Sequence, residues 1–157
     1  MFDREKLINE QLSYAETDTV CFFAPNGDGL REMQEKEWSP VIAWINKAGC
    51  DFKVSEGFEV HSLTERTKNF LKARLDAFPD EELDLFCAVS GGCRSVILAL
   101  AVTDGFLTPE RAFETAILEE RYHALFWADD EDARISREGR KDAVLKAAEK
   151  LKGCQNG

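Results

Sequence analysis

The segment Val96-Ile97-Leu98-Ala99-Leu100-Ala101-Val102 is the starting point for predicting the fold. All seven residues are apolar, so a helix formed here has no polar side to present to water. We therefore predict a helix that is buried on all sides, with other helices packed around it. Asp104-Gly105 should end this helix, and Ser90-Gly91-Gly92 just before it should kink or break the preceding one.

The segments on both sides of this helix repeat apolar residues at helical spacing. Asp3, Ser39 and Ser62 are expected N-caps, and Gly49 and Gly153 are expected to end helices. The predicted helices cover about 3–16, 29–38, 39–48, 62–78, 80–89, 109–127 and the stretch from the acidic turn at 129–132 to Lys152. In the last of these we expect six residues to face inward: Ile135, Ala143, Val144, Ala147, Ala148 and Leu151.

Residues 50–60 (CDFKVSEGFEV) differ from the rest, because apolar residues alternate around Glu56-Gly57. This pattern predicts either a short β-hairpin or an extended chain. The expected fold is therefore mainly α: a compact, bundle-like helical domain over residues 1–157 with one short extended or hairpin element near 50–60.

Composition excludes several classes of function. The chain has 157 residues with 30 acidic and 20 basic side chains, a net charge of −10, which disfavours nucleic acid and anionic membranes as partners. No apolar stretch reaches about 18 residues, so no membrane insertion is expected, and the start MFDREKLINE does not resemble a signal peptide. Five cysteines without a CxxC pair indicate a reducing compartment and neither disulfides nor a zinc site.

Two motifs suggest chemistry but are incomplete. The stretch Ser90–Ser95 resembles a glycine loop before a helix, but it lacks the spacing of a phosphate-binding P-loop. Glu120-x-x-His123 matches half of a di-iron carboxylate site, and no second ExxH motif follows. We therefore predict no cofactor, no metal and no catalytic residue.

The predicted helix at 109–127 carries an unusual pair of acids. At 100° per residue Glu120 shares a face with Phe113, Ala116, Ile117, Ala124 and Trp127, while Leu118, Tyr122, Leu125 and Phe126 form a second apolar face. A helix that is apolar on two sides should be central, which would bury Glu120 and place Glu119 beside it. A buried carboxylate needs a partner, such as Arg94 or Arg74, unless it faces a cleft. The alternatives are an internal ion pair and an acidic spot in a recognition groove.

Acidic residues concentrate around this helix, since residues 104–132 contain nine acidic and two basic side chains. The run Asp129–Asp132 is interpreted as a solvated turn or, alternatively, as a docking patch for a basic partner. The tryptophans Trp38, Trp44 and Trp127 likewise have two interpretations, as core residues or as binding platforms.

Four pieces of the sequence occur in the order seen in a known family. They are Tyr14–Cys21 (YAETDTVC), the set Leu30, Gln34, Trp38, Ser39, Pro40 and Trp44, the buried segment Ser95–Ala101, and Leu118-Glu119-Glu120 followed by Trp127. This ordered set resembles the assembly chaperones of the F-type ATP synthase that hold the alpha subunit of the F(1) head. Ser39, His123 and Ala128 depart from the family pattern, in which Asp, Gln and Gly are usual.

The resemblance covers most of residues 7–148 and corresponds to the family's C-terminal helical region. The family's β-rich N-terminal domain has no counterpart here, which indicates a fragment or a shortened relative. The resemblance implies a non-enzymatic chaperone that shields free alpha subunit until beta displaces it, with Glu119, Glu120 and Trp127 as partner-binding residues. It also implies the bacterial cytoplasm or the mitochondrial matrix, and we expect a monomer.

Two further hypotheses come from other classes of function. The first is a small helical enzyme with Glu119 or Glu120 as general base, which needs a concave pocket that holds a carboxylate and a second polar catalytic group. The second is a structural or interaction domain without chaperone activity.

Overall fold

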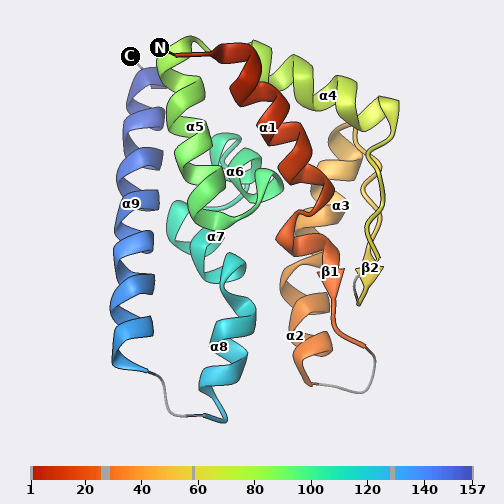
Figure 1. Ribbon diagram of the computed structural model, residues 1–157, viewed down its shortest axis with the longest axis vertical. Helices are drawn as coiled ribbons and strands as arrows, with labels where there is room; N and C mark the ends of the chain where they lie inside the picture. The colour runs from red at the N-terminus through yellow and green to blue at the C-terminus, as the bar shows by residue number, and fades with distance from the viewer. Residues whose placement is uncertain (1, 26–28, 58, 128–129, 157) are drawn as a thin grey trace.

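The computed structural model describes residues 2–25, 29–57, 59–127 and 130–156. It confirms the predicted mainly α fold with one small extended element (Figure 1). In chain order the elements are α1 (Arg4–Glu16), the 3-10 helix η1 (Thr19–Cys21), β1 (Phe22–Phe23), α2 (Gly29–Glu37), α3 (Ser39–Ala48), β2 (Ser55–Glu56), α4 (Glu65–Asp76), α5 (Asp80–Cys93), α6 (Val96–Thr103), α7 (Pro109–Ala116), α8 (Leu118–Ala124) and α9 (Glu131–Asn156).

Helix α6 lies at the centre, as its sequence predicts. Every residue from Val96 to Ala101 is buried, and α6 contacts α1, α3, α5, α7 and α9 (Figure 1). The Ser95 hydroxyl accepts a hydrogen bond from the Leu98 N–H and so caps the helix. The core of the molecule is therefore built around a helix that has no polar face.

Helices α5 and α9 lie side by side along one edge of the molecule (Figure 1). The predicted break at Ser90-Gly91-Gly92 is wrong, because α5 continues to Cys93 and ends at Arg94, whose φ of 53° is left-handed. A Cβ on Gly92 would lie 2.2 Å from Cγ2 of Val144 on α9. This glycine allows a close approach of two helices and does not interrupt one.

The extended element near 50–60 is confirmed, but its pairing partner lies elsewhere in the chain. Ser55–Glu56 pairs in parallel with Phe22–Phe23, in the register Phe22 to Ser55. A hairpin within 50–60 would pair two antiparallel strands of that segment, so of the two alternatives the extended chain is the one that forms. Phe23 is buried and its ring packs edge-on against Trp38, with centroids 5.7 Å apart.

The predicted N-caps hold in part. Asp3 caps α1 by accepting from the Lys6 N–H, but Ser39 is the first residue of α3 and Ser62 precedes a cap at Thr64. The Thr64 hydroxyl accepts from the Thr67 N–H and donates to the Asp51 carboxylate, which fixes this cap in place. A tertiary partner therefore decides which of two nearby hydroxyl residues begins α4.

Helix α9 is buried only in its second half. Ile135 and Ala143, which were expected to face inward, are exposed, and the helix continues past Gly153 to Asn156. Residues 131–136 are all exposed, because this part of α9 extends beyond the end of α5 (Figure 1). Four of the six predicted inward residues are buried: Val144, Ala147, Ala148 and Leu151.

Within the described residues, no helix combines the length and the apolar character needed to cross a bilayer. All five cysteines are free thiols. Burial raises the pKa of Cys50 and of Cys87 to about 11, which keeps both thiols protonated near neutral pH.

Candidate partner-binding site

The single helix predicted for 109–127 is wrong, because the structure breaks it at Ile117 into α7 and α8. The break lies beside the buried indole of Trp38, whose Nε1–H donates to the carbonyl oxygen of Thr115 at 2.9 Å. Thr115 belongs to the last turn of α7, so this bond takes up a carbonyl where the helix ends. Helix α8 then continues in a different direction toward the far end of the molecule (Figure 1).

Helix α2 holds α8 in place through two polar contacts. The buried Gln34 accepts from the Ala24 N–H at 2.7 Å through Oε1 and donates to Glu119 at 3.4 Å through Nε2. Arg121 donates to the well-buried carboxylate of Glu37 at 2.8 Å. Because buried polar groups need partners, these contacts favour one fixed position of α8.

The two glutamates of the predicted site lie at the surface, which corrects the expectation that Glu120 is buried. Glu119 is exposed, and the side chain of Glu120 is 41% exposed. Glu120 pairs with Arg140 at 3.2 Å and with Arg137 at 3.6 Å, both on α9. The break at Ile117 turns this face of the helix toward α9 and away from the core.

The proposed partners Arg94 and Arg74 do not pair with Glu120. Arg74 forms an ion pair with Asp104, and the carbonyl of Arg94 accepts the Thr19 hydroxyl at 2.8 Å. The sequence alone does not identify the real partners, although basic residues at 134, 137, 140 and 141 recur at helical spacing on α9. That stripe was the available signal for a basic face opposite the glutamates.

Glu119 and Glu120 line the same surface cleft, which has a volume of about 330 Å³. It lies where η1, the end of α5, the α7–α8 break and α9 meet, and Arg94 and Arg140 also line it. The cleft therefore offers charges of both signs next to the apolar Ile117. The enzymatic hypothesis requires a concave site with a carboxylate and a second polar group, and this cleft has both. Enzymatic activity stays a prediction.

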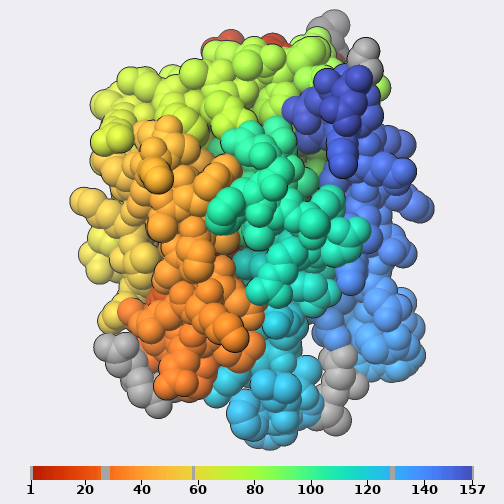
Figure 2. Space-filling view, turned by 180° about the vertical axis from the view of Figure 1, so that it is seen from behind, coloured from red at the N-terminus to blue at the C-terminus, as the bar shows by residue number. Residues whose placement is uncertain are grey.

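Trp127 does not line this cleft and lies just beyond the end of α8. Its side chain is 72% exposed, and Leu125 and Phe126 are 70% and 64% exposed. Of the predicted second apolar face, only Leu118 is fully buried. The end of α8 projects from the bottom of the molecule, where the surface is hollowed between α8 and α9 (Figure 2).

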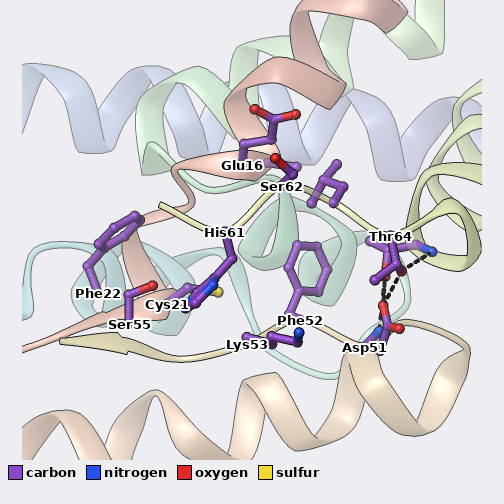
Figure 3. A pocket seen from close by; sticks show the side chains of 13 residues that line it. Glu16, Cys21, Phe22, Asp51, Phe52, Lys53, Ser55, His61, Ser62 and Thr64 are labelled. Carbon is purple, nitrogen blue, oxygen red and sulfur yellow. Dashed lines mark hydrogen bonds between the residues drawn. The ribbon is translucent and has the colours of Figure 1, made fainter. Parts of the chain in front are cut away.

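A second pocket, between η1 and the 51–64 segment, is too small for a substrate. Its volume is about 20 Å³, which is room for roughly one water molecule. Asp51 is fixed there by the Thr64 hydroxyl, and His61 and Cys21 lie at its other end (Figure 3). Burial, with a smaller contribution from Asp18, raises the pKa of the Cys21 thiol.

Asp18 is fully buried and joins η1 to the start of α6. It accepts from the Ser95 hydroxyl at 2.6 Å, from the Ile97 N–H at 3.0 Å and from the Val20 N–H at 3.3 Å. Burial raises the pKa of this carboxyl to about 6, although these hydrogen bonds act in the opposite direction. Tyr14–Cys21 and Ser95–Ala101, two of the segments that carry the family resemblance, therefore meet at the buried carboxyl group of Asp18.

The described residues contain no group of three or more His, Cys, Asp or Glu side chains placed to hold a metal ion. Asp129, part of the predicted acidic turn, lies outside the described residues, whereas Asp130, Glu131 and Asp132 are exposed.

Comparison with known proteins finds proteins of similar sequence and similar fold. The sequence profile of the ATP12 chaperone protein family matches residues 2–46. Protein atp12, mitochondrial, from Schizosaccharomyces pombe is 25% identical over 154 residues, which cover 93% of this chain and 53% of that protein. The chain is thus similar in sequence to ATP12 chaperones. Crystallised Atp12 from Paracoccus denitrificans shares the fold, with a TM-score of 0.88 and 20% identity over 94% of this chain and 64% of that one.

The Atu1473 protein from Agrobacterium tumefaciens is also similar, with a TM-score of 0.85 and 25% identity over 95% of this chain and 56% of that one. The chain spans about half the length of the curated ATP12 relative and less than two thirds of the Paracoccus Atp12 chain.

Proposed function

We propose that the chain is a non-enzymatic assembly chaperone for the F(1) head of ATP synthase and that its client is the free alpha subunit. The relation to the ATP12 chaperones supports the general role, and the sequence resemblance implies the client. We also propose that the described helices act as one domain.

The observation that carries this proposal is the surface position of α8. The helix carries Glu119 and Glu120 and is followed closely by the exposed Trp127. A side chain that is 72% exposed contributes little to the stability of its own chain. Large exposed apolar side chains beside charged ones are typical of a surface that binds another protein.

The physical need for such a chaperone follows from subunit assembly. A free alpha subunit exposes the surface that it uses to bind beta, and large exposed apolar surfaces aggregate. A chaperone that covers this surface must later release it, which favours a mixed apolar and charged contact of moderate affinity. The free cysteines are compatible with a reducing compartment, the bacterial cytoplasm or the mitochondrial matrix.

The proposal is tested by capture of isolated alpha subunit on the immobilised chain, followed by addition of beta. We expect alpha to be retained and beta to release it. Glu119→Gln and Glu120→Gln should each weaken capture, whereas Glu81→Gln, which removes an exposed acid from the first turn of α5, should not. Circular dichroism checks that each variant is folded. Failure of the folded wild-type chain to retain alpha would refute the proposal.

A further inference from the structure

The end of α8 points to a more specific mode of binding, which rests on the proposed function. We infer that Leu125, Phe126 and Trp127, here named the α8 tip, form the main contact with the client. We further infer that the client segment docked there carries apolar side chains flanked by lysine or arginine.

The apolar part of the argument rests on exposure. The three side chains of the α8 tip are 70%, 64% and 72% exposed. Large apolar side chains have areas of roughly 150–250 Å², so the tip presents on the order of 400 Å² to solvent. The three residues follow one another in the chain, and exposed apolar area on this scale is often functional.

The tip is held in place rather than loosely attached. The backbone N–H groups of Phe126 and Trp127 both donate to the carbonyl of His123, at 3.1 and 3.0 Å. The Phe126 ring packs against Tyr122 with centroids 5.0 Å apart. Because α2 fixes α8, the client meets an ordered surface and loses little binding energy to ordering it.

The charges around the tip select the chemistry of the partner. Asp130, Glu131 and Asp132 follow it closely in the chain and are exposed. The neighbouring Arg134 is paired with Glu131 at 2.6 Å and with Glu138 at 2.9 Å, so its charge is largely compensated. A basic segment is attracted to this acidic flank, and an acidic segment is repelled.

Two other occupants are disfavoured by the same observations. A second copy of this chain would bring its own acidic flank against this one, which like charges oppose. Both chain ends lie at the opposite end of the long axis from the tip, so a segment that continued from either would have to run along the whole molecule (Figure 1). A basic, apolar client segment fits best.

The test uses the full chain labelled with 5-fluorotryptophan and unlabelled alpha subunit, so that only the chaperone gives a fluorine NMR signal. Trp38 is buried and Trp44 is stacked on Phe106 at 5.0 Å, so only the Trp127 signal reports an exposed ring. We expect the Trp127 signal to shift when alpha is added and the other two to stay unchanged. Single Trp→Phe variants assign the three signals.

Affinity measurements give the second arm. Trp127→Ser should weaken binding of alpha by roughly 10- to 30-fold, as at other buried tryptophan contacts. Phe2→Ser, which removes an exposed aromatic ring near the N-terminus, is the matched control and should leave binding unchanged. Asp132→Asn should slow association several-fold at low salt, and Glu81→Gln should not.

The outcomes separate the two proposals. If alpha binds with wild-type affinity to Trp127→Ser and the Trp127 signal does not move, the tip is not the contact, although the chaperone function stands. If alpha does not bind at all, the proposed function fails. Self-association that Trp127→Ser abolishes would overturn the client assignment in favour of a second copy of the chain.

Discussion

The pair Gly91 and Gly92 allows a sharp test of how α5 and α9 are joined. A Cβ on Gly92 would lie 2.2 Å from Cγ2 of Val144, whereas a Cβ on Gly91 would meet nothing within 4 Å. The same Gly→Ala change at adjacent positions of one helix should therefore have opposite effects on the free energy of unfolding.

The magnitudes follow from two opposing contributions. Replacing a helical glycine by alanine stabilises by roughly 0.5–1 kcal/mol, and Gly91→Ala should show this gain. Forcing a methyl group into a packed contact costs roughly 1–3 kcal/mol. Val144 gives way poorly, because a valine in a helix has one strongly preferred rotamer. Gly92→Ala should therefore destabilise by about 1–2 kcal/mol.

Urea unfolding followed by circular dichroism measures both variants. Heating gives a second readout, since each 1 kcal/mol shifts Tm by roughly 2–4 °C in a domain of this size. Val144→Ala should destabilise the Gly92→Ala variant by at least about 1 kcal/mol less than it destabilises the wild type, because removing the valine methyl groups makes room for the new one. If Gly92→Ala is as stable as Gly91→Ala, the proposed close contact between α5 and α9 is wrong.

Two other predictions concern buried polar groups. Because folding raises the pKa of Asp18 from 3.8 to about 6, its carboxyl stabilises the fold most at low pH, and this contribution falls by roughly 3 kcal/mol as pH rises through that range. The stability of wild type relative to Asp18→Asn in urea should fall accordingly from about pH 4 to pH 6, and an unchanged relative stability would contradict the assigned shift. Trp38→Phe should lower the unfolding free energy by roughly 1–3 kcal/mol, because it leaves the Thr115 carbonyl without its indole donor. Trp44→Phe, at a half-buried ring, should cost less, and equal losses would argue against the role of the hydrogen bond.

The central position of α6 could be predicted from the sequence because it follows from the residues of α6 alone. Seven apolar residues in a row leave α6 no stable place except the interior, whatever surrounds it. The same argument predicts that each surrounding amphipathic helix packs its apolar face toward the interior. The inward positions of the second half of α9 were predicted for this reason.

The break between α7 and α8 could not be predicted because its cause is distant in the sequence. Residues 109–127 have a continuous helical pattern, and the indole that binds the Thr115 carbonyl comes from Trp38, 77 residues earlier. A continuous helix over these residues puts Glu120 in the core on the helical wheel. The structure places both glutamates on one cleft, whereas the sequence left a groove and an internal ion pair as alternatives and did not reveal the partners of Glu120 on α9.

The glycine pair shows why local signals can have two meanings. Gly91-Gly92 is compatible with a helix break and with a close helix contact, and only the position of Val144 decides between them. The same holds for Ser62 and Thr64, either of which could cap α4 until Asp51 is placed beside Thr64. Patterns within one segment predict which element forms, whereas contacts between segments decide where it ends.

The structure separates the residues that hold the fold from those available for a partner. Trp38, Gly92 and Asp18 are buried or closely packed and determine where α8 and its cleft lie. Leu125 and Trp127, by contrast, are largely exposed. Substitutions in the first group should therefore change binding only by changing the folded structure, and substitutions in the second should change binding at constant stability. Under the proposed function, substitutions in the α8 tip can therefore change the affinity for the client without loss of the fold.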